Sequence, residues 1–146
     1  MPKLGLTIQY ASRAKDLPTR RQLRRWALAA LELDAELTLR IVGRTEGRKL
    51  NLDYRGRDYA TNVLTFIYPD QPMLSGDIVL CAPVVSQEAR VQRRALTAHY
   101  AHLVVHGMLH LQGYDHEHDR QAKAMEQLET EILARLGYPD PYAVDA

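Results

Sequence analysis

The sequence predicts an α/β (α+β) fold, a single layered domain in which helices cover a small mixed sheet of about four strands. Three observations support this prediction. Short segments with the apolar pattern of strands alternate with longer segments that have helical periodicity. The 146 residues are enough for one hydrophobic core, so we expect a single domain over residues 1–146. The composition, 46% hydrophobic and 25% charged residues, is that of an ordinary globular protein.

The first half of the chain is expected to contain two strands and two helices. Residues 4–10 alternate apolar and polar side chains, as a half-buried strand does. A helix is predicted over residues 18–33, because a proline suits its first turn and apolar residues follow at helical spacing. Residues 36–42 are predicted to form the second strand. A short helix interrupted by a glycine should follow over residues 46–54.

The second half is expected to contain two more strands followed by helices. Residues 62–68 and 77–82 have strand character, and a turn rich in proline, aspartate and glycine separates them. A helical region is predicted over residues 83–112, with a break near Arg94. The last helix should span residues 118–136 and stop at a glycine that a proline soon follows.

Three histidines in the second half have the spacing of a metal site. On a helix, His106 and His110 lie one turn and about 40° apart, so both imidazoles face one side. Gly113 can adopt a positive φ and end the helix, which would let His116 approach. Three neutral nitrogen ligands suit Zn²⁺ and leave a fourth tetrahedral position for water, as in catalytic sites. We therefore expect one zinc ion per chain, bound by His106, His110 and His116.

The same helix carries two further histidines, His99 and His102. His102 and His106 form an alternative pair of ligands one turn apart. The pair formed by His106 and His110 is preferred because it adjoins the turn that brings His116 back. We interpret His99 and His102 as packing residues or as hydrogen-bond partners of metal-bound histidines.

The histidine spacing matches the long zinc-protease motif H-E-x-x-H-x-x-G-x-x-H, with one difference. Gly107 occupies the position of the glutamate that acts as general base in those proteases. Glycine cannot accept a proton, so the pattern favours a zinc hydrolase that acts on another substrate. A zinc peptidase-like hydrolase remains the alternative that the ligand spacing supports.

Four segments of the sequence resemble the YbeY family of bacterial endoribonucleases. Residues 106–116 (HGMLHLQGYDH) are similar to the family's H-G-x-L-H-L-x-G-Y-D-H motif. Residues 50–58 (LNLDYRGRD) and 61–66 (TNVLTF) resemble its L-N-x-x-Y-R-x-x-D-x-x-T-[DN]-V-L-S-F segment, and residues 75–80 (SGDIVL) resemble its L-G-D-I strand. The segments come in the family's order, and the resemblance extends over most of the chain. The departures, none of them at a metal ligand, are Ala60 for a common proline, Thr65 for a usual serine and Ser75 for a usual leucine.

This resemblance implies a zinc-dependent, single-strand-specific endoribonuclease. The family acts in ribosomal RNA processing, at the 3′ end of 16S rRNA, and in ribosome quality control. The implied partners are therefore ribosomal RNA and the small ribosomal subunit with its assembly proteins. A ribosome-assembly factor whose metal only holds the fold together is a further alternative.

Arg55 and Asp115 are the main candidates for catalysis. In the family, the arginine of the Y-R-x-x-D segment is implicated in activity, so the resemblance implies that Arg55 contacts the scissile phosphate, which a guanidinium binds at two points. Read alone, an arginine between Asp53 and Asp58 is more often part of a surface ion pair. Arg57 is a weaker candidate for the same role. Asp115 is either the general base or a residue that orients a histidine ligand, although the scissile phosphate itself could also act as base.

Composition and charge indicate the cellular compartment and the kind of partner that we expect for the protein. A single cysteine, Cys81, fits a reducing cytoplasm, and the N-terminal residues lack the apolar core of a secretory signal. No apolar run approaches the ~20 residues of a membrane span, so we expect no membrane partner. Residues 1–60 carry 13 Lys and Arg against 7 Asp and Glu, whereas residues 61–146 carry 6 against 11. A basic half is compatible with a polyanionic partner such as RNA.

Overall fold

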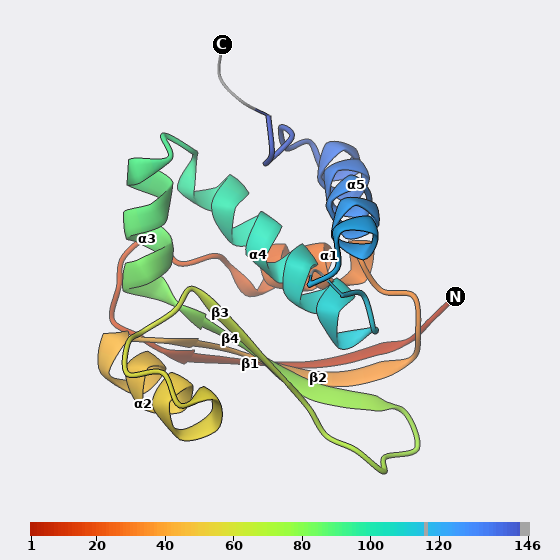
Figure 1. The fold of residues 1–146 in the computed structure, drawn as a ribbon, viewed down its shortest axis with the longest axis horizontal. Coiled ribbons are helices and arrows are strands. Elements are labelled where there is room, and N and C mark those ends of the chain that lie inside the picture. The colour runs from red at the N-terminus through yellow and green to blue at the C-terminus, as the bar shows by residue number, and fades with distance from the viewer. Residues whose placement is uncertain (116, 144–146) are drawn as a thin grey trace.

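The computed structural model describes residues 1–115 and 117–143. Within these residues, strands and helices follow one another along the chain as Figure 1 shows. The strands are β1 (Leu4–Ala11), β2 (Ala35–Val42), β3 (Val63–Ile67) and β4 (Leu74–Cys81). The helices are α1 (Arg20–Ala29), α2 (Arg44–Arg55), α3 (Ala82–Val91), α4 (Leu96–Leu111) and α5 (Asp119–Leu136).

The strands form one mixed sheet in the order β1-β2-β4-β3. β1, β2 and β4 run parallel, and β3 is antiparallel to β4. The predicted α/β fold with a mixed sheet of about four strands is therefore confirmed.

Helices cover the two faces of the sheet unequally. α1, α3, α4 and α5 lie on one face and α2 lies on the other (Figure 1). α4 occupies the middle of the thicker layer, in contact with α1, α3 and α5, and 12 of its 16 residues are buried. Because water reaches so little of α4, polar side chains on this helix need hydrogen-bond partners within the protein.

Several helix and strand bounds differ from the prediction for local physical reasons. α1 begins at Arg20 instead of residue 18, because Thr19 forms a capping box with Gln22. α2 continues through Gly47, where a Cβ atom would lie only 3.0 Å from Cys81 Sγ, so this glycine allows α2 to pack closely on the sheet. The predicted break near Arg94 is present, since α3 ends at Val91 and α4 begins at Leu96.

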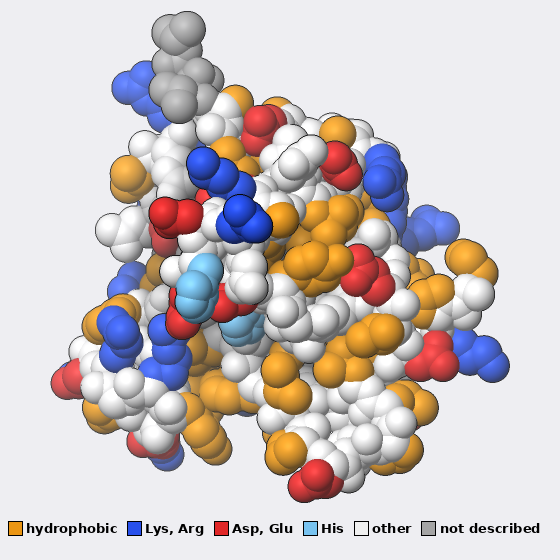
Figure 2. All heavy atoms as spheres, turned by 45° about the vertical axis from the view of Figure 1, so that its right-hand side comes forward, with side chains coloured by type: hydrophobic (Ala, Val, Ile, Leu, Met, Phe, Trp, Pro, Cys, Tyr) orange, Lys and Arg blue, Asp and Glu red, His pale blue; other side chains and the backbone are white. Residues whose placement is uncertain are grey.

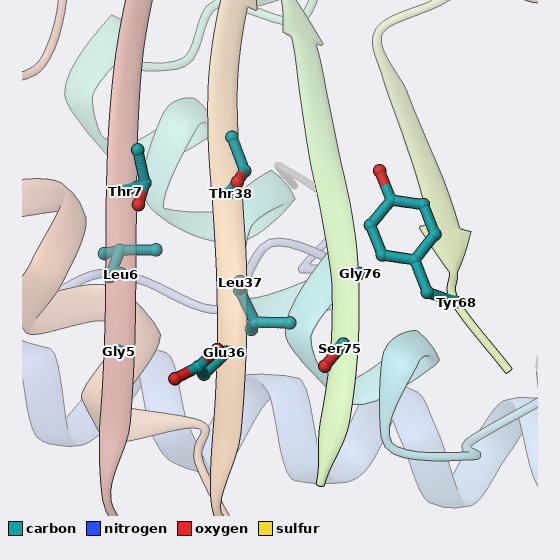
Figure 3. Close-up of a pocket in the computed structure, with 9 residues that line it drawn as sticks. All are labelled: Gly5, Leu6, Thr7, Glu36, Leu37, Thr38, Tyr68, Ser75 and Gly76. Atoms are coloured by element: carbon teal, nitrogen blue, oxygen red, sulfur yellow. The ribbon is translucent and has the colours of Figure 1, made fainter. Parts of the chain in front are cut away.

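The part of the sheet that α2 leaves uncovered is polar. Thr7 and Thr38 are neighbours on adjacent strands, and Glu36 lies on the same strand as Thr38 (Figure 3). The hydroxyl of Tyr68 donates a hydrogen bond to Asp77. Thr7, Glu36, Thr38 and Tyr68 are among the residues that line a shallow cavity of about 380 Å³.

The described residues include no helix with the length and apolar character required to cross a bilayer.

Candidate active site

A cavity of about 410 Å³ lies beside the C-terminal half of α4, next to β3 and the end of α2. Histidine side chains reach the surface of the molecule with acidic and basic side chains around them (Figure 2). The residues that line the cavity come from four parts of the chain: Arg55, Thr61, Asn62, Val63, Leu64, Thr65, His106, His110 and Glu117. The cavity therefore brings the segment around Arg55 next to the histidine helix.

α4 presents His106 and His110 to this cavity from successive turns. Both residues are half-buried, so the cavity offers access to their side chains. Gly107 faces the opposite way, because a Cβ atom there would lie 3.2 Å from Cγ2 of Ile78 in β4. The position that carries the base in zinc proteases is thus directed into the core.

Arg55 reaches the cavity because α2 ends there. Gly56 has a φ of 69°, a left-handed conformation that glycine adopts readily, and its N–H bonds the carbonyl of Leu52. The ion pair expected between an arginine here and Asp58 does not form, since the Asp58 carboxylate accepts two bonds from Arg48, of 2.6 and 2.9 Å. Arg55 is exposed and makes no ion pair with any described residue.

The sequence analysis did not identify Glu129, whose carboxylate contacts two of the histidines. This carboxylate belongs to α5 and is fully buried. One oxygen lies 2.8 Å from His106 Nδ1, and the other lies 2.9 Å from His102 Nε2 and accepts a bond from the Tyr142 hydroxyl. Burial alone would raise the pKa of the Glu129 carboxyl, but the bonds from His102, His106 and Tyr142 outweigh it and lower the pKa to about 2.

The ionised Glu129 selects one tautomer of His106. A carboxylate only accepts hydrogen bonds, so His106 donates its Nδ1 proton to Glu129, and in the neutral ring the lone pair is then on Nε2. A histidine whose second nitrogen donates to a carboxylate is the usual arrangement at protein metal sites. In this tautomer Nε2 of His106 is the acceptor nitrogen of the ring, which is the kind of donor atom that a transition-metal ion takes.

Further hydrogen bonds extend the network away from Glu129 towards α3. Arg94 Nη1 lies 3.4 Å from His102 Nδ1 and 3.1 Å from His99 Nδ1. His99 Nε2 lies 2.9 Å from Glu88, which also accepts a bond from Asn62 in the cavity wall. Burial lowers the pKa of His99, and the adjacent Arg94 lowers it further, against the opposing effect of Glu88. His99 and His102 therefore take part in the network that supports the cavity.

The segment after α4 is described in part. Asp115 is not among the described residues that line the cavity; its Oδ1 accepts a bond from the Glu117 N–H at 2.8 Å, and its Oδ2 lies 3.3 Å from His118 Nδ1. Glu117, which the sequence did not single out, does line the cavity. The expected third ligand, His116, lies outside the described residues. Among the residues that are described, no group of three or more His, Cys, Asp and Glu side chains is arranged to hold a metal ion.

A sequence signal for Glu129 did exist. The buried residues of α5 are Met125, Glu129, Ile132 and Leu133, which fall on one helical stripe. A glutamate within an apolar stripe is rarely buried unless it is paired. That pattern marks Glu129 as a candidate partner for a histidine or cation, although it does not identify which one.

Comparison with known proteins gives a consistent result. The family model described as Endoribonuclease YbeY matches residues 9–137. Curated proteins named Endoribonuclease YbeY include one from Methylobacillus flagellatus, 58% identical over 98% of this chain and 96% of its own length. Another, from Aromatoleum aromaticum, is 60% identical over 97% of this chain and 94% of its own length. The solution structure of TM1509 from Thermotoga maritima matches the fold with a TM-score of 0.58 and 24% identity, over 95% of this chain and 99% of that one.

Proposed function

Because the chain belongs to the YbeY family of endoribonucleases, we propose that it cleaves single-stranded RNA at a zinc ion bound by His106, His110 and His116. Membership makes the protein a nuclease that hydrolyses phosphodiester bonds. The observation that supports the proposed site is a single cavity whose wall contains Arg55, His106 and His110. Histidine ligands for a cation and a guanidinium for a phosphate, placed on one cavity, would suit hydrolysis of a phosphodiester.

His106 and His110 would supply two of the three nitrogen ligands, with His116 as the third. When bound, the zinc ion would lower the pKa of water towards ~7 and offset negative charge on the phosphate. Glu129 accepts the Nδ1 proton of His106, which makes Nε2 the nitrogen that would bind the metal and fixes the ring plane. The Glu129 carboxylate would therefore fix the orientation and tautomer of the His106 ring before a metal ion binds.

Arg55 would contact the scissile phosphate. A guanidinium stays charged at every working pH and donates two parallel bonds to phosphate oxygens. Because no described carboxylate competes for it, Arg55 can turn to the substrate without breaking an ion pair. That freedom distinguishes it from Arg48 on the same helix, which is bound to Asp58.

Asp115 would orient the segment that carries His116, or act as the general base. Its bond to the Glu117 N–H spans position 116, which favours the orienting role. The scissile phosphate remains the other candidate for the base.

The substrate and partners follow from the family resemblance. We propose that the RNA is ribosomal, that cleavage matures the 3′ end of 16S rRNA, and that the protein serves ribosome quality control. It would act in the cytoplasm with the small ribosomal subunit and its assembly proteins. The chain would bind one zinc ion.

The test combines metal analysis with RNA cleavage. We expect near-stoichiometric zinc in the purified wild type, and cleavage of a labelled single-stranded RNA that a chelator stops and added zinc restores. His110→Ala should lose most of the metal and the cleavage, whereas His118→Ala, which removes an exposed histidine outside the ligand set, should retain the metal.

Two results would contradict the proposal. The ligand set is wrong if His106→Ala, His110→Ala and His116→Ala all keep near-stoichiometric zinc. The substrate is wrong if the wild type leaves RNA intact but digests casein in a metal-dependent way, which is not expected because Gly107 offers no base.

A further inference from the structure

A third cavity, also of about 380 Å³ but separate from the two described above, lies at the end of the sheet where the parallel strands terminate. β2 ends at Val42 just before α2, and β4 ends at Cys81 just before α3, so both helices start here (Figure 1). The loop after β1 contributes Lys15 to the same wall. The chain leaves β1 towards one face of the sheet and β2 towards the other, and α/β sheets bind ligands at such a divergence.

The charged side chains around this cavity are mostly basic. Lys15, Arg44 and Arg90 come from three separate segments, and all three are exposed. None of them forms an ion pair with a described residue, in contrast to Arg40 and Arg48, which are paired with carboxylates. Asp16 is the one acidic residue among those described in the wall. The cavity thus carries excess positive charge that the described residues leave uncompensated.

Two helix N-termini meet beside these cations. The thiol of Cys81, the residue before α3, lies 3.6 Å from the carbonyl oxygen of Gly43, the residue before α2. Neither helix has a side-chain hydrogen bond capping its first turn. α3 has no acidic residue there, although Pro83 lacks an N–H, and Glu46 in the first turn of α2 is paired with Arg40. Uncapped N-termini present N–H groups and partial positive charge, which favours an anion.

A buried tyrosine provides an independent indication of a ligand. Tyr100 of α4 is only 2% exposed, yet it forms part of the cavity wall. Within the described part of the chain its hydroxyl has no hydrogen-bond partner. Burial raises the pKa of Tyr100 to about 12, so the hydroxyl keeps its proton and can donate it to an acceptor. The side chain is thus held in the core while the residue borders the cavity, where a ligand could accept its hydrogen bond.

We propose that this cavity binds a phosphate group, and that the phosphate belongs to the RNA substrate at a nucleotide other than the one cleaved. Three cations, two helix N-termini and a tyrosine hydroxyl are all donors, and a phosphodiester offers only acceptors. The inference rests on the proposed function, because RNA is the substrate invoked. On α3, Ser86 and Arg90 face this cavity while Glu88 turns to Asn62 in the active-site wall, so the RNA would pass around this helix.

The decisive variant is Arg44→Ala/Arg90→Ala, which removes two exposed guanidinium groups. Its control is Lys3→Ala/Arg135→Ala, which removes the same charge from exposed positions outside the cavity. Binding of a labelled single-stranded RNA is measured by fluorescence anisotropy with chelator present, over a range of salt concentrations. We expect the cavity variant to bind about tenfold more weakly, with a salt slope less steep by about 1.4, since each phosphate contact contributes about 0.7 for single strands.

Two further measurements separate the outcomes. Tyr100→Phe should weaken RNA binding severalfold while the thermal transition stays close to that of the wild type. Adenosine monophosphate should compete with RNA at millimolar concentration only; if the nucleotide binds more tightly than RNA and loses its affinity in the cavity variant, the RNA assignment is overturned. Equal affinity and equal salt slope in the cavity and control variants would overturn the site itself. A wild type that binds RNA through these residues but never cleaves it would instead contradict the proposed function.

Discussion

Glu129 keeps a negative charge inside the core because His102, His106 and Tyr142 all donate hydrogen bonds to it. A buried carboxylate without such donors would take up a proton near neutral pH. The charge in turn determines which nitrogen of His106 carries the proton when the ring is neutral. Glu129 therefore acts through His106, as a positioning residue.

Replacing Glu129 by glutamine tests that role. The amide would keep the volume of the side chain but present an N–H group to one of the two imidazoles, so His106 could lose its fixed tautomer. We expect Glu129→Gln to weaken zinc affinity by about 10- to 100-fold, measured by competition with a chromophoric chelator. Glu131→Gln, on the exposed side of α5, serves as control. Unchanged zinc affinity in a folded Glu129→Gln protein would remove Glu129 from the site.

Arg55 offers a separate test, because its proposed contact is with the substrate alone. Arg55→Lys keeps the charge but loses the planar two-point contact. We expect RNA cleavage to fall at least about tenfold, roughly 1.4 kcal/mol of transition-state stabilisation, with zinc content and thermal stability unchanged.

Arg57→Lys is the matched control for that measurement. Arg57 lies two residues away, bonds the Tyr59 hydroxyl at 3.3 Å and is not among the residues that line the cavity. Equal cleavage by the two variants would return Arg55 to an ordinary surface position.

At the scale of secondary-structure elements, the close approach of strands β3 and β4 restricts which residue can stand at position 76. β4 approaches β3 so tightly at Gly76 that a Cβ atom there would overlap the carbonyl oxygen of Phe66. The obstacle is backbone, so it cannot move without breaking the pairing of the two strands. This geometry gives a physical reason for glycine in the G-D-I segment.

Gly76→Ala should therefore be strongly destabilising. We expect a loss of at least about 2 kcal/mol in the free energy of unfolding, measured by urea denaturation, because β3 must separate locally from β4. Ser75→Ala, at the adjacent position, should change stability by less than about 1 kcal/mol. A Gly76→Ala protein as stable as the wild type would show that the strands can move apart at little cost.

Local sequence predicts these elements well and their ends less well. Hydrophobic periodicity locates each strand and helix because burial imposes it on short segments. The start of β4 at Leu74, three residues before the predicted position, depends on pairing with β2 and β3, which no local pattern encodes. α1 likewise ends at Ala29 instead of residue 33.

Some residues of the candidate site can likewise be predicted from local sequence, whereas others cannot. His106, His110 and Arg55 stand out because their motifs are contiguous in the sequence. Glu129 and Glu88 are recruited from α5 and α3 by tertiary packing, and only the finished fold brings them to the histidines. Sequence motifs thus identify residues that face the cavity, whereas the residues that hold them in place emerge from the structure.

The network that crosses α3, α4 and α5 should make the stability of the protein depend on pH. His99 is buried against Arg94, and its pKa lies below the usual value of 6.5. An unfolded chain therefore takes up this proton at a higher pH than the folded protein does. The stabilising contribution of neutral His99 is complete above about pH 6.5 and is lost as the pH falls through the folded pKa.

Chemical denaturation between about pH 7.5 and about pH 5 checks this expectation. With chelator present, the wild type should lose stability as the pH falls, and His99→Gln should show a shallower dependence, by up to about 1.4 kcal/mol per pH unit. The glutamine amide could still accept a bond from Arg94 and donate one to Glu88. Parallel curves for the two proteins would show that His99 does not couple folding to pH.

The order of the strands also constrains how the chain can be built during translation. β3 is synthesised before β4, yet β4 is the strand with which it pairs, and β4 also completes the exposed edge of β2. Until the ribosome has released residues 74–81, the nascent chain can form only the β1–β2 pair, with hydrophobic segments of α1 and β2 partly uncovered. Non-local parallel pairing of this kind is slow to form and leaves intermediates prone to aggregation. The complete strand order can therefore form only after β4 has emerged.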